Sequence, residues 1–369
     1  MSPMSRFFSE KYKNLTAYTP GEQPRDRRYI KLNTNESPYP PSAPVMEAVA
    51  AECGRLELYS DPACTELVKT ASSYFDVPQD CLIMTNGSDE VLNFAFMAFS
   101  DADHPIVFPD VTYGFYPVFA ALSGIPYEEI PLAEDFSVRV SDYVGIGKNI
   151  VLANPNAPTG LALPLAAIEE IVASNLQHVV IIDEAYVDFG AESAVPLVKK
   201  YDNLLVTGTF SKSRSMAGAR LGFGIGNPAL IRDLKTIQYS TNPYNVNRMT
   251  AAAGRAALLD DGYYKENCRK IARTRETTRQ ALLALGFEVT DSKANFLFAR
   301  SEKIEGEALS IALRGRGILV RHFAVPRIRA YNRITVGTPE QMETLLSAVK
   351  EILEEGPDGT GKEAKRETK

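Results

Sequence analysis

The sequence predicts an α/β protein with a large domain, built on a mainly parallel sheet flanked by helices, and a smaller α/β domain made from both chain ends. From Leu82 to about Asn245, short apolar runs alternate with amphipathic stretches of helical period, which is typical of strand–helix repeats around a parallel sheet. The run Val179–Ile182 is apolar without interruption, as expected for a parallel strand buried on both faces. A length of 369 residues suffices for two domains with a sizeable core.

The expected elements follow in chain order. Residues 1–36 should form an N-terminal arm and loop. The large domain, 37–258, should hold helices at 45–54, 65–75 and 91–99 and strands at Leu82–Met84, Ile106–Phe108, Ile150–Leu152, Val179–Ile182, Leu204–Val206 and Phe223–Ile225. The small domain, 259–355, should open with a long helix at 260–284 and add helices at 305–314 and 338–353 and strands at Phe296–Phe298, Ile318–Arg321 and Ile334–Val336. The tail 356–369 has no apolar face and is expected to be disordered.

Composition narrows the class of protein. Hydrophobic content of 45% and charged content of 23% are typical of a globular chain, and the net charge of −6 argues against a general nucleic-acid partner. No apolar run is long enough to span a membrane, and the first residues lack the apolar core of a signal peptide. The four cysteines show no C-x-x-C pairing and the three histidines are scattered, so we expect no metal site, no disulfide frame and a cytoplasmic location.

The most informative segment is TGTFSKSRSMAGARLGFGIG, at 207–226, directly after the predicted strand 204–206. Thr209, Ser211 and Arg220 place two hydroxyls and a guanidinium near Lys212, a combination that favours an anion. A lysine amine in such a place can act as a nucleophile. The plain alternative is a solvated surface lysine.

Two further segments end predicted strands with polar residues. Asn156 lies in the turn NPNAPTG, at 154–160, where a rigid loop would let its amide bind a ligand oxygen; an ordinary Asn-Pro turn is the alternative. Asp183 and Tyr186 end the strand 179–182, at the carboxyl edge where open α/β sheets bind ligands. A helix N-cap and a ring at the edge of the core are the alternatives for this pair.

The three segments together fit one cofactor, pyridoxal phosphate (PLP). PLP needs an amine for its aldehyde, an anion-binding cup for its phosphate, a carboxylate facing its ring nitrogen and donors to its phenolic oxygen. Lys212 supplies the amine, and Thr209, Ser211 and Arg220 supply the cup. Asp183 supplies the carboxylate, and Tyr186 and Asn156 supply the donors.

These residues mark a resemblance to the fold-type I aminotransferases, and more narrowly to the histidinol-phosphate aminotransferase family. The resemblance runs from about Tyr18 to about residue 353. NPNAPTG, DEAY (183–186) and Ser211-Lys212 are specific for the wider group. LNTNESPYPP (32–41) and RITVGT (333–338) narrow it, and LYSDP (58–62), TNGSDE (85–90), PDVTYGFY (109–116), KANFLF (293–298) and GILVRHF (317–323) add to it.

The resemblance implies further roles. Gly87, Ser88 and Asp89 would form the turn that holds the cofactor phosphate at a helix N-terminus, although a plain capped helix is the alternative. Tyr113 would stack on the cofactor ring, and Tyr59 would reach the phosphate of a neighbouring subunit's cofactor, which implies a homodimer with shared active sites. The resemblance assigns the substrate side to Tyr18, Asn35, Arg321 and Arg333, with a buried strand beginning at Arg333. A surface arginine at a strand end is the alternative for Arg321.

The implied activity is transamination from histidinol phosphate to 2-oxoglutarate, with an aromatic amino acid aminotransferase and a PLP-dependent phospho-amino-acid decarboxylase as alternatives. The glycines at Gly222, Gly224 and Gly226 are a weak match to a nicotinamide-binding pattern, because no glycine stands three residues after Gly226. Arg214, which follows Lys212 by two residues, is expected to face solvent.

Overall fold

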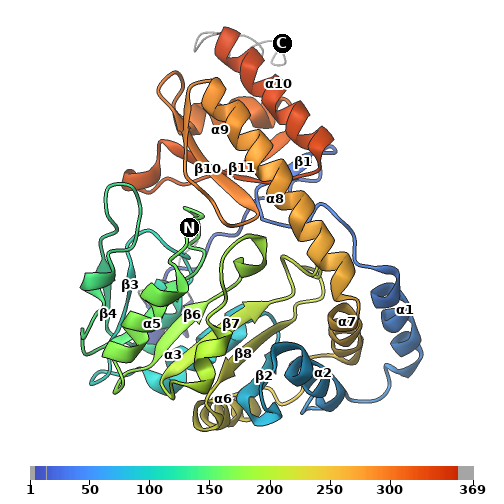
Figure 1. The fold of residues 1–369 in the computed structure, drawn as a ribbon, viewed down its shortest axis with the longest axis vertical. Helices are drawn as coiled ribbons and strands as arrows, with labels where there is room; N and C mark the ends of the chain where they lie inside the picture. The colour runs from blue at the N-terminus through green and yellow to red at the C-terminus, as the bar shows by residue number, and fades with distance from the viewer. Residues whose placement is uncertain (1–4, 14, 356–369) are drawn as a thin grey trace.

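The computed structural model describes residues 5–13 and 15–355 and organises them around two sheets, one in each half of the molecule (Figure 1). The larger sheet has seven strands in the order β2-β8-β7-β6-β5-β3-β4. Its strands are β2 (Leu82–Thr85), β3 (Ile106–Pro109), β4 (Tyr127–Ile130), β5 (Asn149–Ala153), β6 (Val180–Asp183), β7 (Leu204–Thr209) and β8 (Gly222–Gly226).

The larger sheet is mainly parallel, as the sequence predicts. β8 is the exception, since it runs antiparallel to both β7 and β2. A parallel return would need a crossover, usually through a helix. The chain between β7 and β8 instead turns back within residues 210–221 and carries Lys212 in that turn. The turn therefore holds the lysine at the carboxyl edge of the parallel strands.

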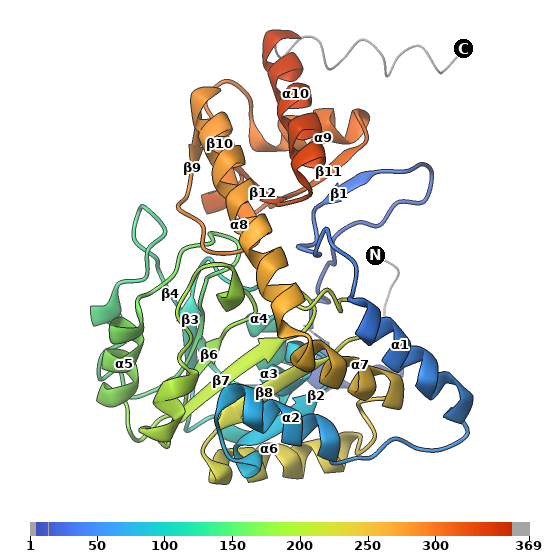
Figure 2. The ribbon, with the colours of Figure 1, turned by 45° about the vertical axis from the view of Figure 1, so that its right-hand side comes forward.

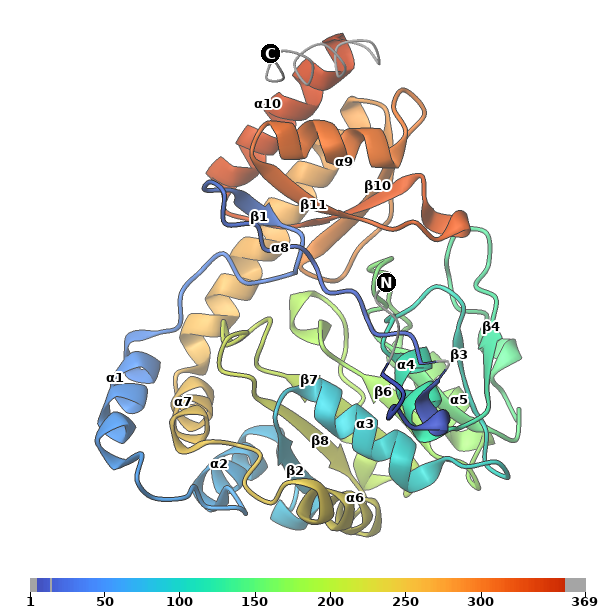
Figure 3. The ribbon, with the colours of Figure 1, turned by 180° about the vertical axis from the view of Figure 1, so that it is seen from behind.

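Helices cover both faces of this sheet because the side chains of each strand alternate between two cores. Ile181 packs with the core beneath α3 (Ser88–Phe99), α4 (Tyr116–Ser123) and α6 (Pro228–Thr241), the layer in front in Figure 3. Its neighbours Val180 and Ile182 point the other way. They join the core under α2 (Thr65–Phe75), α5 (Leu165–Ser174) and α7 (Arg248–Leu259).

The smaller sheet has five strands in the order β1-β11-β12-β10-β9. β1 (Ile30–Leu32) pairs in parallel with β11 (Ile318–His322), so a segment near the N-terminus lies beside the C-terminal strands. The other members are β9 (Phe287–Val289), β10 (Phe296–Ser301) and β12 (Tyr331–Thr335). Its apolar core includes side chains of α8 (Asp261–Ala284), α9 (Gly306–Gly315) and α10 (Pro339–Glu355).

The helix α8 connects the two halves (Figure 2). It begins at the corner with α7, beside which α1 (Ala43–Glu52) packs, and runs up to the smaller sheet. Leu282, near its far end, is fully buried in the core of that sheet. A displacement of the first turn of α8 would therefore shift residues in both halves.

The expected long strands and helices are present, with ends that differ by a few residues. For example, the strand expected to begin at Arg333 begins at Tyr331, because Tyr331 and Asn332 already pair with β10. The short strands β1, β4 and β9 were not predicted. In β4, the first three residues Tyr127, Glu128 and Glu129 are exposed, so this strand shows no apolar run. The domain limits stay a prediction, and the tail expected to be disordered, 356–369, lies outside the described residues. Among the described helices, none is long and apolar enough to cross a membrane.

Candidate active site

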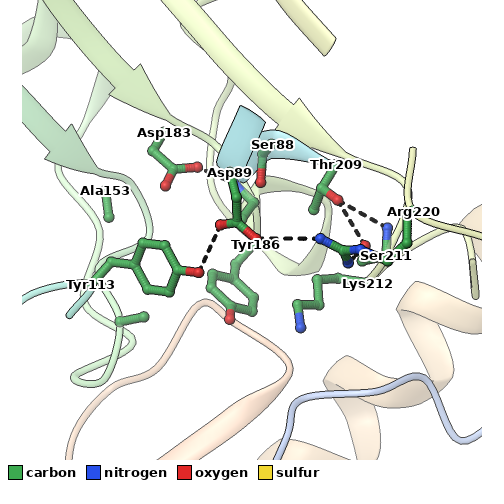
Figure 4. Close-up of a pocket in the computed structure, with 12 residues that line it drawn as sticks. Ser88, Asp89, Tyr113, Ala153, Asp183, Tyr186, Thr209, Ser211, Lys212 and Arg220 are labelled. Atoms are coloured by element: carbon green, nitrogen blue, oxygen red, sulfur yellow. Dashed lines mark hydrogen bonds and ion pairs between the residues drawn. The ribbon is translucent and has the colours of Figure 1, made fainter. Parts of the chain in front are cut away.

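A pocket lies at the carboxyl edge of the parallel strands of the larger sheet (Figure 4). The strand ends of β5, β6 and β7 contribute Ala153, Asp183 and Thr209. Its complete lining is Ser88, Asp89, Tyr113, Ala153, Ala157, Asp183, Ala185, Tyr186, Thr209, Ser211, Lys212 and Arg220. Three segments far apart in sequence thus meet where the sequence predicted a site.

Lys212 projects into this pocket from the turn between β7 and β8. Its Nζ donates a hydrogen bond to the Thr34 carbonyl at 3.2 Å and lies 5.9 Å from the centre of the Tyr186 ring. Figure 4 shows Lys212 and Tyr186 projecting to the same side of the pocket. Thr34 follows β1 of the smaller sheet. The hydrogen bond from Lys212 therefore joins the turn between β7 and β8 to the other half of the molecule.

One end of the pocket is built to hold an anion. The Thr209 hydroxyl donates to Ser211 Oγ at 3.0 Å, and Arg220 Nη1 donates to the same oxygen at 3.4 Å. The N-terminus of α3, at Ser88, points its free backbone N–H groups and its positive dipole end to this place. Together they offer hydroxyl, guanidinium and backbone donors to one group.

Glycine is required where β8 passes the start of α3. A Cβ on Gly222 would lie 2.3 Å from the backbone N of Ser88, closer than any real contact. Gly87, at the N-cap of α3, has φ +79° and a Cβ there would lie 2.5 Å from Arg220 Nη2. The anion cup therefore depends on two glycines, of which the sequence analysis assigned only Gly87 to the phosphate site.

Asp183 stands at the opposite end of the pocket, fully buried. The Tyr116 hydroxyl donates to its Oδ2 at 3.0 Å, while the Ala185 N–H and the Thr207 hydroxyl donate to Oδ1 at 3.3 and 3.4 Å. Burial raises the pKa of Asp183 to about 6, against the effect of these donors. The sequence analysis missed Tyr116; its only signal was its place three residues after Tyr113 in the quoted segment 109–116.

Two tyrosines and an asparagine frame the pocket. The Tyr113 hydroxyl donates to Asp89 Oδ1 at 2.7 Å, and Asp89 Oδ2 pairs with Arg220 at 3.3 Å. Burial raises the pKa of Tyr113 well above its usual range, so its hydroxyl keeps the proton. Asn35 Nδ2 donates to the Tyr186 hydroxyl at 2.9 Å, which ties the segment after β1 to the pocket.

Two arginines of the smaller sheet lie side by side near this pocket. Arg333 on β12 and Arg321 on β11 are directly opposite partners in the antiparallel register, an arrangement that is unfavourable without an anion between the charges. Arg333 Nη2 donates to the Asn33 carbonyl at 3.1 Å, but its buried Nε has no hydrogen-bond partner among the described residues. Burial lowers the pKa of Arg333, with Tyr186 and Tyr18 near enough to oppose that effect.

Arg321 makes contact with the N-terminal segment. Its Nη2 donates to the Thr19 carbonyl at 3.0 Å, and its Nη1 to the Pro20 carbonyl at 3.4 Å. The next side chain, Tyr18, packs against Phe115 with the rings tilted by 32° and 4.3 Å between their centres. The N-terminal segment thus contacts both halves, while the assignment of Tyr18 to the substrate side stays a prediction.

Seven predicted site residues lie outside the pocket lining: Gly87, Tyr18, Asn35, Tyr59, Asn156, Arg321 and Arg333. The amide of Asn156 donates hydrogen bonds to the Val111 carbonyl and to Thr159 Oγ1, at 2.9 and 3.0 Å. It would have to change partners to bind a ligand. Tyr59 is 80% exposed and stacks on Tyr244. The prediction that Arg214 faces solvent is wrong: the side chain is buried, with a salt bridge of 2.8 Å to Asp261 that no sequence pattern indicated.

Comparison with known proteins gives a consistent picture. The family model for class I and II aminotransferases matches residues 27–349. Histidinol-phosphate aminotransferases of Brachyspira hyodysenteriae and Bradyrhizobium diazoefficiens are each 48% identical over 95% of this chain, which spans 99% and 100% of their lengths. A crystal structure of histidinol-phosphate aminotransferase from Sinorhizobium meliloti in complex with pyridoxal-5′-phosphate matches with a TM-score of 0.85 at 23% identity, over 96% of this chain and 99% of that one.

Proposed function

Because the chain belongs to the class I and II aminotransferase family, we propose that it transfers the amino group of L-histidinol phosphate to 2-oxoglutarate, using PLP. The products are imidazole-acetol phosphate and glutamate, and the reaction is a step of histidine biosynthesis. The observation that carries the choice of donor is the pair Arg321 and Arg333, of which Arg333 lies within electrostatic reach of the pocket tyrosines Tyr186 and Tyr113.

The residues of the pocket fit PLP. The cup of Thr209, Ser211, Arg220 and the start of α3 would hold the phosphate, and the buried carboxylate of Asp183 would face the ring nitrogen at the other end. Lys212 would bind the aldehyde carbon covalently. Tyr113 would cover one face of the ring, and Tyr186 would donate to its phenolic oxygen. Asn156 would donate there too, after its amide leaves the Val111 carbonyl or Thr159 Oγ1.

When bound, PLP supplies an electron sink that accepts the charge released when the donor loses its Cα proton. The protein supplies the positioning and the proton transfers. With PLP bound, the Lys212 amine would act as the base that takes the proton from the donor's Cα and passes it on. Asp183 holds a proton on the ring nitrogen, and Tyr116 and Thr207 fix the orientation of its carboxylate.

The arginine pair favours a doubly charged donor group. Two guanidinium groups on facing strands match a phosphate dianion better than a single carboxylate. The buried Nε of Arg333, which has no hydrogen-bond partner among the described residues, is a donor that a bound phosphate oxygen would satisfy. The aromatic pair Tyr18 and Phe115 can pack on an imidazole or a phenyl ring, so it leaves an aromatic amino acid as the second candidate donor.

The test is a single-turnover experiment with PLP-loaded protein, following loss of the lysine-bound absorption band. We expect conversion to be faster with histidinol phosphate than with phenylalanine. The reverse order would keep the residue roles and move the enzyme to aromatic amino acid metabolism. Release of carbon dioxide from a phosphorylated amino acid, without transfer of its amino group, would favour the decarboxylase alternative.

Replacing Arg321 by glutamine tests the clamp. We expect KM for histidinol phosphate to rise about 10- to 100-fold, the effect of losing one charge-assisted hydrogen bond, and KM for phenylalanine to rise much less. Arg300→Gln is the matched control, since it removes an exposed cation of the same sheet that pairs only with Glu288 among the described acidic residues. Equal losses for both donors would argue against selective binding of the phosphate.

We also propose a cytoplasmic homodimer. Exposed apolar side chains gather on α1, on the segment after it and at the end of α7, a surface that suits a second copy of the chain. They are Met46, Leu56, Leu58, Tyr59 and Leu259. Tyr59 belongs to this group, and from its stack on Tyr244 its exposed side chain would reach a neighbouring subunit's cofactor phosphate.

A further inference from the structure

Arg214 is a buried cation two residues from Lys212 with no part in the chemistry described so far. Its side chain is 8% exposed. Its Nη2 lies 2.8 Å from Asp261 Oδ1 and donates to the Tyr74 hydroxyl at 2.6 Å, and its Nη1 donates to the Ala257 carbonyl at 3.3 Å. The rings of Tyr74 and Tyr264 flank the guanidinium at 5.0 and 5.4 Å.

These partners all belong to one corner of the fold. Ala257 lies in the last turn of α7, and Asp261 is the first residue of α8. Tyr74 on α2 closes a triangle, because its hydroxyl also bonds Asp261 Oδ1 at 3.0 Å. Arg214 therefore fastens the lysine-bearing turn to the point where α8 leaves the large sheet.

The same helix contacts two loop segments through another arginine. Arg275 of α8 donates to the carbonyls of Phe189 and Ala294, at 2.9 and 2.6 Å. Phe189 follows Tyr186 in the segment after β6, and Ala294 precedes β10 of the smaller sheet. One helix is thus fixed to the segment after β6 and to the segment before β10, and Arg214 joins its first residue to the lysine turn.

The rest of that turn is held by contacts with other parts of the larger-sheet half and with the segment after β1. The Met216 N–H donates to the Phe210 carbonyl at 3.1 Å, and the Ser215 hydroxyl bonds Ser37 at 3.0 Å. Neither contact reaches α8. A lysine that must both bind a carbon atom and move a proton between two others needs its backbone fixed closely.

We propose that Arg214 is a positioning residue that fixes the Lys212 turn to the α7–α8 corner and so sets where the lysine amine stands relative to both sheets. The proposal rests on the proposed PLP-dependent function. It predicts that proton transfer, rather than donor binding, depends on the contact between Arg214 and Asp261.

The test compares Arg214→Met, Arg214→Lys, Asp261→Asn and the double variant Arg214→Met/Asp261→Asn. Arg269→Met is the matched control, because Arg269 lines the same 300 Å³ cavity beside Arg214 but pairs with Glu266. We expect Arg214→Met and Asp261→Asn each to lower kcat about 10- to 100-fold while KM for the donor stays within about 3-fold. Arg214→Lys should recover part of kcat.

A second readout needs no donor. The circular dichroism of the lysine-bound PLP band reports the placement of the cofactor, and we expect it to change in Arg214→Met and Asp261→Asn but not in Arg269→Met. The double variant should lose no more than the worse single variant, since both cut one contact. A wild-type protein that binds PLP but converts neither donor would refute the proposed function. The comparison of dichroism between the variants would still test the role of Arg214.

The outcomes separate cleanly. A folded Arg214→Met protein with unchanged kcat and unchanged dichroism would overturn the proposal, as would losses that add in full in the double variant. If Arg214→Met does not fold, the kcat and dichroism of Asp261→Asn test the proposal instead. This variant should fold, because Arg214 keeps Tyr74 and Ala257 as partners. A rise in KM with kcat unchanged would also overturn it.

Discussion

Replacing Lys212 by alanine is expected to reduce turnover about 10⁴-fold or more, because the variant loses the covalent attachment point of the cofactor and the base that moves the proton. The pocket should survive, since the lysine's only bond from Nζ among the described residues goes to the Thr34 carbonyl. PLP should still bind through the cup at Arg220, Ser211 and α3. The measurement is steady-state transamination together with PLP titration of the same preparation.

Chemical rescue distinguishes a lost base from a damaged fold. Added methylamine should restore part of the rate in Lys212→Ala, because a small amine can enter the space that the side chain leaves. Lys293→Ala is the control, since that lysine is paired with Asp291 outside the pocket lining. Substantial activity in clean Lys212→Ala protein without added amine would refute the assigned role.

The parts of this site that could be predicted share one physical property: each lies at the end of an apolar run. Parallel strands align their carboxyl ends at one edge, so Asp183 and Thr209 had to come close once their strands were recognised. Lys212 follows in the turn that reverses the chain into β8. Local sequence and sheet geometry were together enough to predict this half of the pocket.

The parts that could not be predicted depend on partners distant in sequence. Arg214 looks like a surface residue because its charge is normally solvated. Its burial rests on Tyr74 and Asp261, which lie 140 and 47 positions away. Tyr116 reads as one more aromatic residue of an apolar helix until its hydroxyl is seen at 3.0 Å from Asp183. Periodicity reports which face a residue occupies, but not which polar atom it meets there.

Asp183 exposes a conflict between stability and function. Burial raises the pKa of its carboxyl from 3.8 to about 6, so at pH 7 and above the cofactor-free protein holds a desolvated charge. Asp183→Asn is therefore expected to stabilise the cofactor-free protein, by about 3 kcal/mol at most from the size of that shift. In the holoenzyme the proposed pairing with the ring nitrogen reverses the balance, and the variant should bind PLP more weakly and take up the Cα proton more slowly.

The sign of the pH dependence follows from the same shift. The folded-state pKa lies above the unfolded value, so the folded cofactor-free protein binds this proton more tightly, and that stabilisation is lost as pH rises from 3.8 through about 6. Asparagine does not titrate. The difference in free energy of unfolding between Asp183→Asn and wild type should therefore grow across this window and level off above it, in denaturant melts of both cofactor-free proteins.

The neighbouring Glu184 provides the matched control. It is also buried, it accepts bonds from the Ser193 hydroxyl and the Ala194 N–H, and burial raises its pKa to about 8, so at pH 7 it is mostly protonated already. It does not line the pocket. Glu184→Gln should leave both PLP affinity and stability at pH 7 nearly unchanged. If both substitutions weakened PLP binding equally, the effect would belong to the buried strand end in general, and Asp183 would lose its assigned role as the partner of the cofactor ring.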